Sequence, residues 1–243
     1  MPWSFVTTSW SQILAAREAP SSEARQALEA LCRAYWQPLY AFVRRQGHDA
    51  QECADLTQAY FAELLEKGYL HDFDPSQGRF RVFLKASVKN FLSKERVKAR
   101  AWKRGGRAAI VSLEANAFEG HLRHEPADHF TPEEVYEQRW ALTLLERVLE
   151  TLRGEMAAGG RGGEFDRLKA CLTGEEPRVP HREVAADLGL TEAAVRAAVH
   201  RLRQRFGRLL RQEIERTLAK PDEADDEVKH LLAVIAPWSP RGS

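Results

Sequence analysis

Apolar side chains recur every three or four positions along most of this chain, and no stretch shows the apolar/polar alternation of a half-buried strand. In ALEALCRAYWQPLYAFVRRQG the apolar residues share one helical face, which predicts a helix that Pro38 kinks or divides and that Gly47 ends. The same periodicity continues in DAQECADLTQAYFAELLEKG and in RFRVFLKASVKNFLSKERVKARAWKR. This half of the chain is therefore expected to consist of amphipathic helices.

The periodicity lapses between positions 105 and 130, and we interpret that part as a linker. Thr131, Pro132 and Glu134 then indicate the start of a new helix. Threonine caps a helix, proline suits its first position, and a glutamate three residues after the cap completes a capping box. A long helix through WALTLLERVLETL is predicted to follow, and the glycine-rich GGRGGEF beyond it is interpreted as a flexible connector.

Length and composition fit two small domains. The chain has 243 residues, of which 44% are hydrophobic and 29% charged, and these values are typical of a soluble globular protein. We predict an all-α fold of two small helical domains joined by an irregular linker. The expected segments are an N-terminal extension (1–21), a first domain (22–105), the linker (106–130), a second domain (131–217) and a C-terminal extension (218–243).

Several classes of function find no support in the sequence. No apolar run approaches the roughly 18 residues of a membrane span, and the N-terminus lacks the pattern of a signal peptide, so we expect a cytoplasmic protein without membrane association. The three cysteines lie far apart and are expected to be reduced core residues. No Ser/His/Asp set, phosphate-binding loop or metal-ligand spacing is present, so the residues give no signature of an enzyme, and we expect no cofactor and no metal.

The stretch REVAADLGLTEAAVRAAVHRLRQRF, residues 182–206, has the form of a helix-turn-helix. Gly189 can adopt the left-handed conformation that ends its first helix, and Thr191 can cap the second. Between positions 195 and 211 there are six arginines and no acid. Such a face suits phosphates and guanine edges in a major groove, and a helical hairpin with a solvated basic face is the alternative.

A second basic segment, residues 79–107, carries eleven basic residues and the single acid Glu95, a local net charge of +10. Three phenylalanines and Trp102 interleave with these cations. Cations along a backbone combined with rings that stack on bases are what a single strand requires. The three phenylalanines also fall on the apolar stripe, so packing in the core is the competing interpretation for them, whereas Trp102 lies beyond that stripe.

In order and spacing, DAQECADLTQAYFAELL, GRFRVFLKASVKNFLSKERVKAR and the helix-turn-helix resemble a bacterial RNA polymerase sigma factor of the extracytoplasmic-function type, over roughly residues 22–217. The resemblance implies an all-helical protein that binds core RNA polymerase and directs it to promoter DNA, both duplex and melted single strand.

The resemblance also implies three sets of site residues. Polymerase binding would use Asp55, Leu56 and Gln58. The minus-ten element would be bound by Ser87, Lys89, Asn90, Ser93, Arg96, Lys98 and Arg100. The minus-thirty-five element would be read by Thr191, Arg196, His200, Arg201 and Arg203.

Two features depart from the family pattern or extend it. Ala54 stands where the family usually has an acid, which weakens the negative polymerase-binding face, and Thr57 in the same motif is a candidate for phosphorylation by a Ser/Thr kinase.

In the C-terminal extension, residues 228–235 are predicted to form an amphipathic helix. This helix is expected to regulate a DNA-binding domain by folding back on it, to dock on a partner such as an anti-sigma protein, or to pack against the second domain.

Two other functions fit parts of the same pattern. One is a transcription regulator that binds duplex DNA through the helix-turn-helix and never contacts the polymerase. The other is a helical adaptor whose surfaces bind protein partners. The basic segment favours an initiation factor over the first of these, because a sensor domain has no need of a helix with a net charge of +10.

Overall fold

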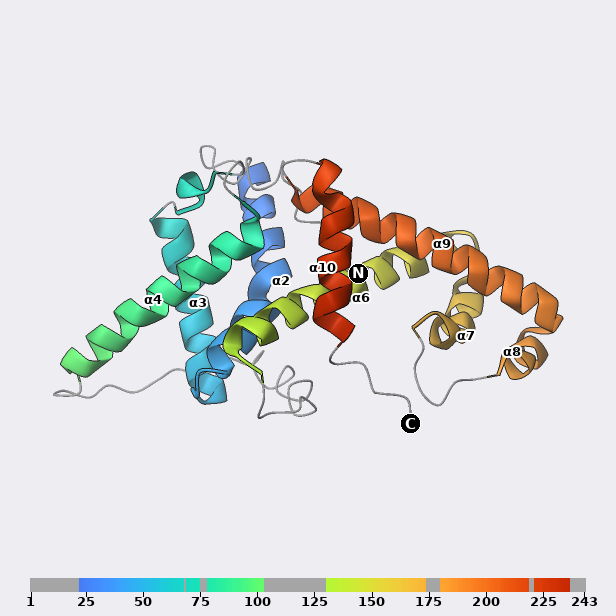
Figure 1. Ribbon diagram of the computed structural model, residues 1–243, viewed down its shortest axis with the longest axis horizontal. Coiled ribbons are helices and arrows are strands. Elements are labelled where there is room, and N and C mark those ends of the chain that lie inside the picture. The colour runs from blue at the N-terminus through green and yellow to red at the C-terminus, as the bar shows by residue number, and fades with distance from the viewer. Residues whose placement is uncertain are drawn as a thin grey trace. The chain divides into compact units, whose positions relative to one another are not determined.

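The computed structural model describes residues 22–67, 69–74, 78–102, 130–173, 180–218 and 221–236, and within them it contains helices and no strand (Figure 1). The predicted all-α class is confirmed. None of the helices in these ranges is long and apolar enough to cross a membrane. The elements are α2 (Ser22–Arg44), α3 (Ala50–Glu66), η1 (Tyr69–Asp72), α4 (Phe80–Trp102), α6 (Pro132–Ala158), α7 (Gly162–Thr173), α8 (His181–Leu188), α9 (Glu192–Thr217), η3 (Pro221–Glu223) and α10 (Ala224–Ile235).

The described residues fall into two compact units. One unit contains the residues up to Thr143 and those from Glu215 onward, and the other is Leu144–Ile214. This division differs from the predicted one, because the first turns of α6 and the C-terminal helix α10 belong to the unit that holds α2, α3 and α4. The C-terminal helix contacts residues of both predicted domains, because Glu227 pairs with Arg81 and His230 contacts Glu137, which lies within the predicted second domain (131–217).

Aromatic side chains fill the core of the first unit. Tyr35 meets Phe80 edge-to-face at 5.5 Å between ring centroids, and Tyr60 meets Phe91 in the same way at 5.6 Å. Phe80 and Phe91 are buried, so for these two the core interpretation is confirmed. α2 continues through the buried Pro38 to Arg44, and the predicted division of this helix does not occur.

Helix boundaries in the first unit follow the predicted signals. Gly47 adopts a φ of 91°, in the turn that follows α2. Asp49 caps α3 by accepting a hydrogen bond from the backbone N–H of Glu52 at 2.8 Å. At α6 the Glu134 carboxylate accepts from the Thr131 backbone N–H at 2.7 Å, while the Glu134 N–H donates to the Thr131 hydroxyl at 3.2 Å. The predicted capping box is confirmed.

The described cysteines are free thiols. Cys53 is buried, and Cys32 and Cys171 are partly buried. Burial, reinforced by the nearby Glu29 carboxylate, raises the pKa of the Cys32 thiol to about 11, so this thiol stays protonated and unreactive at neutral pH.

The second unit contains the helix-turn-helix, formed by α8 and α9. Gly189 has a φ of 63° and ends α8, and the Thr191 hydroxyl accepts a hydrogen bond from the Ala194 N–H at 3.2 Å. Both predicted signals are confirmed. The glycine-rich connector is shorter than predicted. Only residues 159–161 form a turn, and α7 already begins at Gly162.

The left-handed turn at Gly189 gives a direct test of this architecture. An L-residue in that conformation costs roughly 1–2 kcal/mol, so Gly189→Ala is expected to lower the free energy of unfolding by about that amount. Gly207→Ala is the matched control, since a Cβ at Gly207 within α9 meets nothing within 4 Å and alanine there should raise stability by up to about 1 kcal/mol. Denaturant unfolding of both variants measures the difference, and equal effects would contradict the assigned turn.

Candidate nucleic-acid interface

Helix α4 presents two polar faces with different neighbours. Ser87, Asn90 and Lys94 are three, four and seven residues apart, so they share one face, which looks onto α3 and η1. Arg81 and Lys85 lie on another face, where their partners come from α6 and α10. We call these the pocket face and the pairing face.

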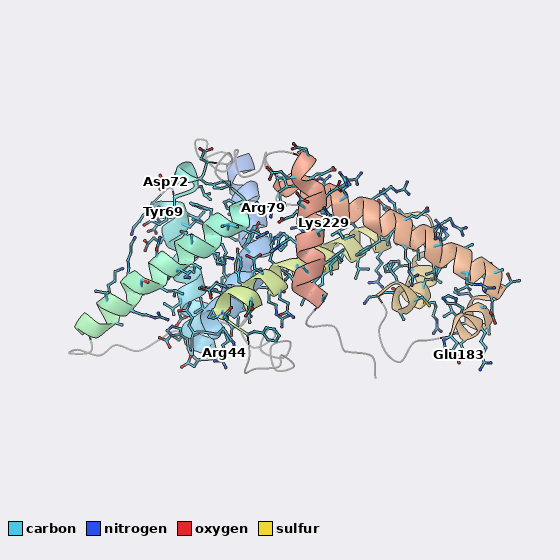
Figure 2. All side chains as sticks on the ribbon, in the orientation of Figure 1. Arg44, Tyr69, Asp72, Arg79, Glu183 and Lys229 are labelled. Atoms are coloured by element: carbon cyan, nitrogen blue, oxygen red, sulfur yellow. The ribbon has the colours of Figure 1, made fainter. Side chains whose placement is uncertain are left out.

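The pocket face borders a pocket of about 290 Å³. Its walls come from three elements that the first unit holds together: α3, η1 and α4. Tyr69 and Asp72 of η1 are labelled in Figure 2. The lining residues are Glu63, Tyr69, Asp72, Phe83, Ala86, Ser87, Asn90, Phe91 and Lys94.

Charged groups of both signs surround the aromatic rings of this pocket. The Glu63 carboxylate accepts a hydrogen bond from the Tyr69 hydroxyl at 2.8 Å and pairs with Lys67 at 2.8 Å. The bond from Lys67, together with that from Tyr69, lowers the pKa of Glu63 against a smaller opposing effect of burial, so Glu63 is an ionised acceptor at neutral pH. The Lys94 ammonium lies 5.7 Å from the centroid of the Tyr69 ring, within cation–π range.

This combination suits a planar, polar ring. The half-buried rings of Tyr69 and Phe83 offer stacking surfaces, and Asn90 is an exposed amide that can both donate and accept. Lys94 adds a cation at the rim for a neighbouring phosphate. These are the groups that hold an unstacked nucleobase in known modes of single-strand recognition.

The structure separates the residues predicted to bind the minus-ten element. Ser87 and Asn90 line the pocket, whereas Ser93 is exposed and does not. Lys89 instead binds Glu133 of α6 at 2.6 Å, and Arg96 donates to the Gln46 side chain.

Towards its end α4 leaves the pocket. Lys98 is exposed and pairs with Glu95 at 2.7 Å. Arg100 belongs to α4, but its side chain lies outside the described residues, as does that of Trp102.

Four further polar residues of the pocket were not predicted as site residues from the sequence: Glu63, Tyr69, Asp72 and Lys94. For Lys94 a signal exists, because it follows Asn90 by four residues and Ser87 by seven on one helical face. The other three come from α3 and from the short η1, whose place beside α4 is set by tertiary packing and leaves no periodic pattern.

The three predicted polymerase-binding residues are partly or fully accessible on α3. Gln58 is exposed, Leu56 is half-buried, and Asp55 is half-buried and accepts from the Gln51 amide at 3.0 Å. Ala54 is buried, so an acid at this position would lie in the core rather than on the face that carries Asp55. The exposed acid nearby is Glu52, which pairs with His48 at 2.9 Å.

Thr57 lies in the interior of the first unit. Its side chain is 0% exposed and its hydroxyl donates to the Cys53 carbonyl at 2.7 Å. A kinase cannot reach a hydroxyl in this position, and the core offers no room for a doubly charged phosphate. The predicted phosphosite at Thr57 is therefore incompatible with this packing.

In the helix-turn-helix, the four basic residues predicted to read DNA are exposed on α9: Arg196, His200, Arg201 and Arg203. Arg203 donates to the Cys171 carbonyl of α7 at 2.9 Å, and His200 bonds the Gln204 amide at 3.0 Å. Thr191 is occupied as the cap of α9, so it positions this helix.

The pairing face of α4 centres on the buried guanidinium of Arg81. Its Nη1 lies 2.9 Å from Glu137 of α6, and its Nε and Nη2 lie 2.9 and 3.2 Å from the two carboxylate oxygens of Glu227 in α10. The same guanidinium lies 4.6 Å from the ring centroid of Trp140. Arg79, labelled in Figure 2, also pairs with Glu227. One side chain thus joins three helices.

Further ion pairs continue this face along α4. Lys85 binds Glu137 at 2.5 Å, and Lys89 binds Glu133 at 2.6 Å. Both pairs of partners are four residues apart on their helices, so α4 and the start of α6 run in opposite directions with matched charges. The Tyr136 hydroxyl adds a hydrogen bond to the Arg81 carbonyl at 2.9 Å.

The charges around Glu137 determine its ionisation. Burial alone would raise the pKa of this carboxyl, but Arg81, Lys85 and the nearby His230 outweigh burial, and the pKa is lowered below its usual value of 4.5. The His230 Nε2 lies 3.3 Å from the carboxylate. Glu137 is therefore ionised in the folded protein at neutral pH.

No family model, curated protein or solved structure matches this chain. Among the described residues, no group of three or more His, Cys, Asp or Glu side chains could hold a metal ion.

The lowered pKa of Glu137 predicts a specific pH dependence. A carboxyl with a depressed pKa in the folded state stabilises the fold above its unfolded pKa, and that contribution is lost as the pH falls through the folded pKa. The free energy of unfolding is therefore expected to fall more steeply below about pH 4.5 in the wild type than in Glu137→Gln. At pH 7 the variant should be less stable by roughly 3–5 kcal/mol, the usual cost of removing one partner from a buried pair.

Denaturant titrations between pH 3 and pH 7 measure both effects. Glu134→Gln serves as the control, because Glu134 lies on the same helix and also has a lowered pKa, but it is exposed and bonds Thr131 alone. The same pH slope for the wild type and Glu137→Gln would contradict the assigned network.

Proposed function

We propose that this protein is a transcription initiation factor of the sigma type, which binds core RNA polymerase and directs it to promoter DNA in the cytoplasm. The observation that carries the proposal is the pocket on α4, where Ser87 and Asn90 lie together with aromatic rings and Lys94. The resemblance to sigma factors assigns both of these residues to binding of the minus-ten element. Their meeting in one pocket supports that assignment.

The pocket would act on melted promoter DNA. Extruding a base from the duplex costs a few kcal/mol, and stacking on an aromatic side chain returns about 1–3 kcal/mol per base. Hydrogen bonds from Asn90 and Ser87 to the base edge would add to this. Holding the open strand more tightly than the duplex is the thermodynamic requirement for opening DNA without ATP.

The exposed end of α4 would extend this contact to the backbone. Residues 93–99 are exposed except for Glu95, and they include Lys94, Arg96 and Lys98. Each cation placed beside a phosphate releases a counterion and makes binding dependent on salt.

The other two surfaces complete the proposed activity. Asp55, Leu56 and Gln58 on α3 would contact the polymerase, and the basic face of α9 would enter the major groove of the minus-thirty-five element. The protein supplies binding energy only, and the polymerase carries out phosphodiester chemistry.

Run-off transcription with purified core polymerase tests this function. On genomic fragments, the protein is expected to produce start sites that core polymerase alone does not use. Asn90→Ala should reduce their yield about five-fold or more, in line with the roughly 1–3 kcal/mol that a bidentate pair between a side-chain amide and a base contributes. Val82→Ala is the matched control: Val82 is 45% exposed on the same helix but does not line the pocket, and its variant should behave like the wild type.

The rival functions predict other results. A regulator that binds duplex DNA only would produce no new start sites, yet would lose operator binding on Arg196→Ala. A protein adaptor would bind neither form of DNA. Equal transcription by Asn90→Ala and Val82→Ala would remove the pocket from the mechanism.

A further inference from the structure

Helix α10 is held to the first unit by one fully buried large apolar side chain, by partly buried ones, and by the buried ion pairs of Glu227. Of its twelve residues only Ala224, Glu227 and Leu231 are buried, and Leu231 is the only large apolar side chain among them. Leu232, on its other side, is 59% exposed. Figure 1 shows α10 crossing α6, whose Glu137 contacts His230. The attachment of this helix therefore depends heavily on the charge of Glu227.

Glu227 occupies the position that a phosphate would take on a cationic surface. Its two oxygens accept from the Nε and Nη2 of Arg81 in a fork, the geometry with which arginine also binds phosphate. Arg79 reaches the same carboxylate from the start of α4. The Glu227 side chain is 1% exposed and that of Arg81 is 5% exposed, so Arg81 is withheld from any other anion, while Arg79, at 27%, is partly accessible.

The covered arginines begin a row of cations along one side of α4. Arg81, Lys85 and Lys89 are spaced four residues apart, which is about 6 Å along a helix. Glu137 and Glu133 of α6 pair with Lys85 and Lys89. The Lys89 pair is solvent-exposed, with both side chains more than a third accessible, and is weak for that reason. Glu227, which pairs with Arg79 and Arg81, is the carboxylate in this set that α10 carries.

We propose that α10 is a displaceable cover, which competes with the sugar–phosphate backbone of a single-stranded nucleic acid for Arg79 and Arg81. With α10 in place, α4 offers its pocket face and its exposed end to a strand. When α10 leaves, the two arginines become available, and Arg81 keeps its Nη1 contact with Glu137. Displacement therefore adds phosphate contacts without dismantling the pairing of α4 with α6.

Three variants distinguish the effect of releasing α10 from the effect of changing the net charge of the protein. Glu227→Gln removes the charge that holds α10. Asp226→Asn removes the same charge from the neighbouring position, where the carboxylate pairs with Lys229 at 3.0 Å and both side chains are 76% exposed. Leu231→Ala weakens the attachment of α10 and leaves every charge in place.

Two measurements on the full chain follow each variant. Hydrogen exchange of the α10 amides reports release, and exchange of the α3 amides reports whether the first unit stays folded. Fluorescence anisotropy with a 20-nucleotide oligothymidylate reports binding, including its dependence on salt. This probe needs no promoter and no polymerase. A negative result in the transcription experiment would therefore not contradict the proposal that α10 covers the two arginines.

Glu227→Gln and Leu231→Ala are expected to speed α10 exchange at least ten-fold, with α3 unchanged. Both should bind oligothymidylate several-fold more tightly, with a salt slope steeper by about 1.4 for two added phosphate contacts at 0.7 each. Asp226→Asn should match the wild type in the exchange rate of the α10 amides and in the salt slope of oligothymidylate binding.

Three results would overturn the proposal. The first is faster α10 exchange in Leu231→Ala with unchanged affinity and slope. The second is equal behaviour of Glu227→Gln and Asp226→Asn. The third is failure of all four proteins to bind the oligonucleotide.

Discussion

A single buried cation, the guanidinium of Arg81, joins α6 and α10 to α4 in the first unit. The Arg81 side chain is 5% exposed. Each of its three guanidinium nitrogens donates to one of two carboxylates, which belong to helices far away in the sequence. Buried ion pairs contribute little net stability, because desolvation offsets most of their attraction, but leaving one partner alone is costly. The network therefore mainly specifies how the helices dock. α6 and α10 dock on α4 where their acids pair with Arg81, because any other register would leave a buried charge without a partner.

This constraint divides α4 into surfaces with separate tasks. The pairing face is closed by carboxylates of the same chain, and the pocket face remains open beside η1 and α3. A run of eleven basic residues that appears uniform in the sequence is thus used in two ways: some cations hold the fold, and others are available to an external anion. The proposed melted-strand contact and the proposed cover both rest on this division.

Local structure was predictable because short-range rules determine it. The capping box at Thr131, the left-handed Gly189 and the amphipathic stripes of α2, α3 and α4 follow from residues a few positions apart. The contacts of α10 were not predictable from the sequence. The two acids that pair with Arg81 lie 56 and 146 residues away from it, and charge alone does not specify which acids an arginine will contact. Burial of Thr57 had a readable signal, since positions 53, 57, 60 and 64 share one helical face.

Site-specific photo-cross-linking tests the central claim, that the two faces of α4 have different partners. A photoreactive residue is placed at position 90 or at position 89 and irradiated with a single-stranded promoter oligonucleotide in the presence of core polymerase. The account predicts a strong cross-link to DNA from position 90 and a weak one from position 89, which faces Glu133. Equal cross-linking from both positions, or a stronger link from position 89, would contradict it.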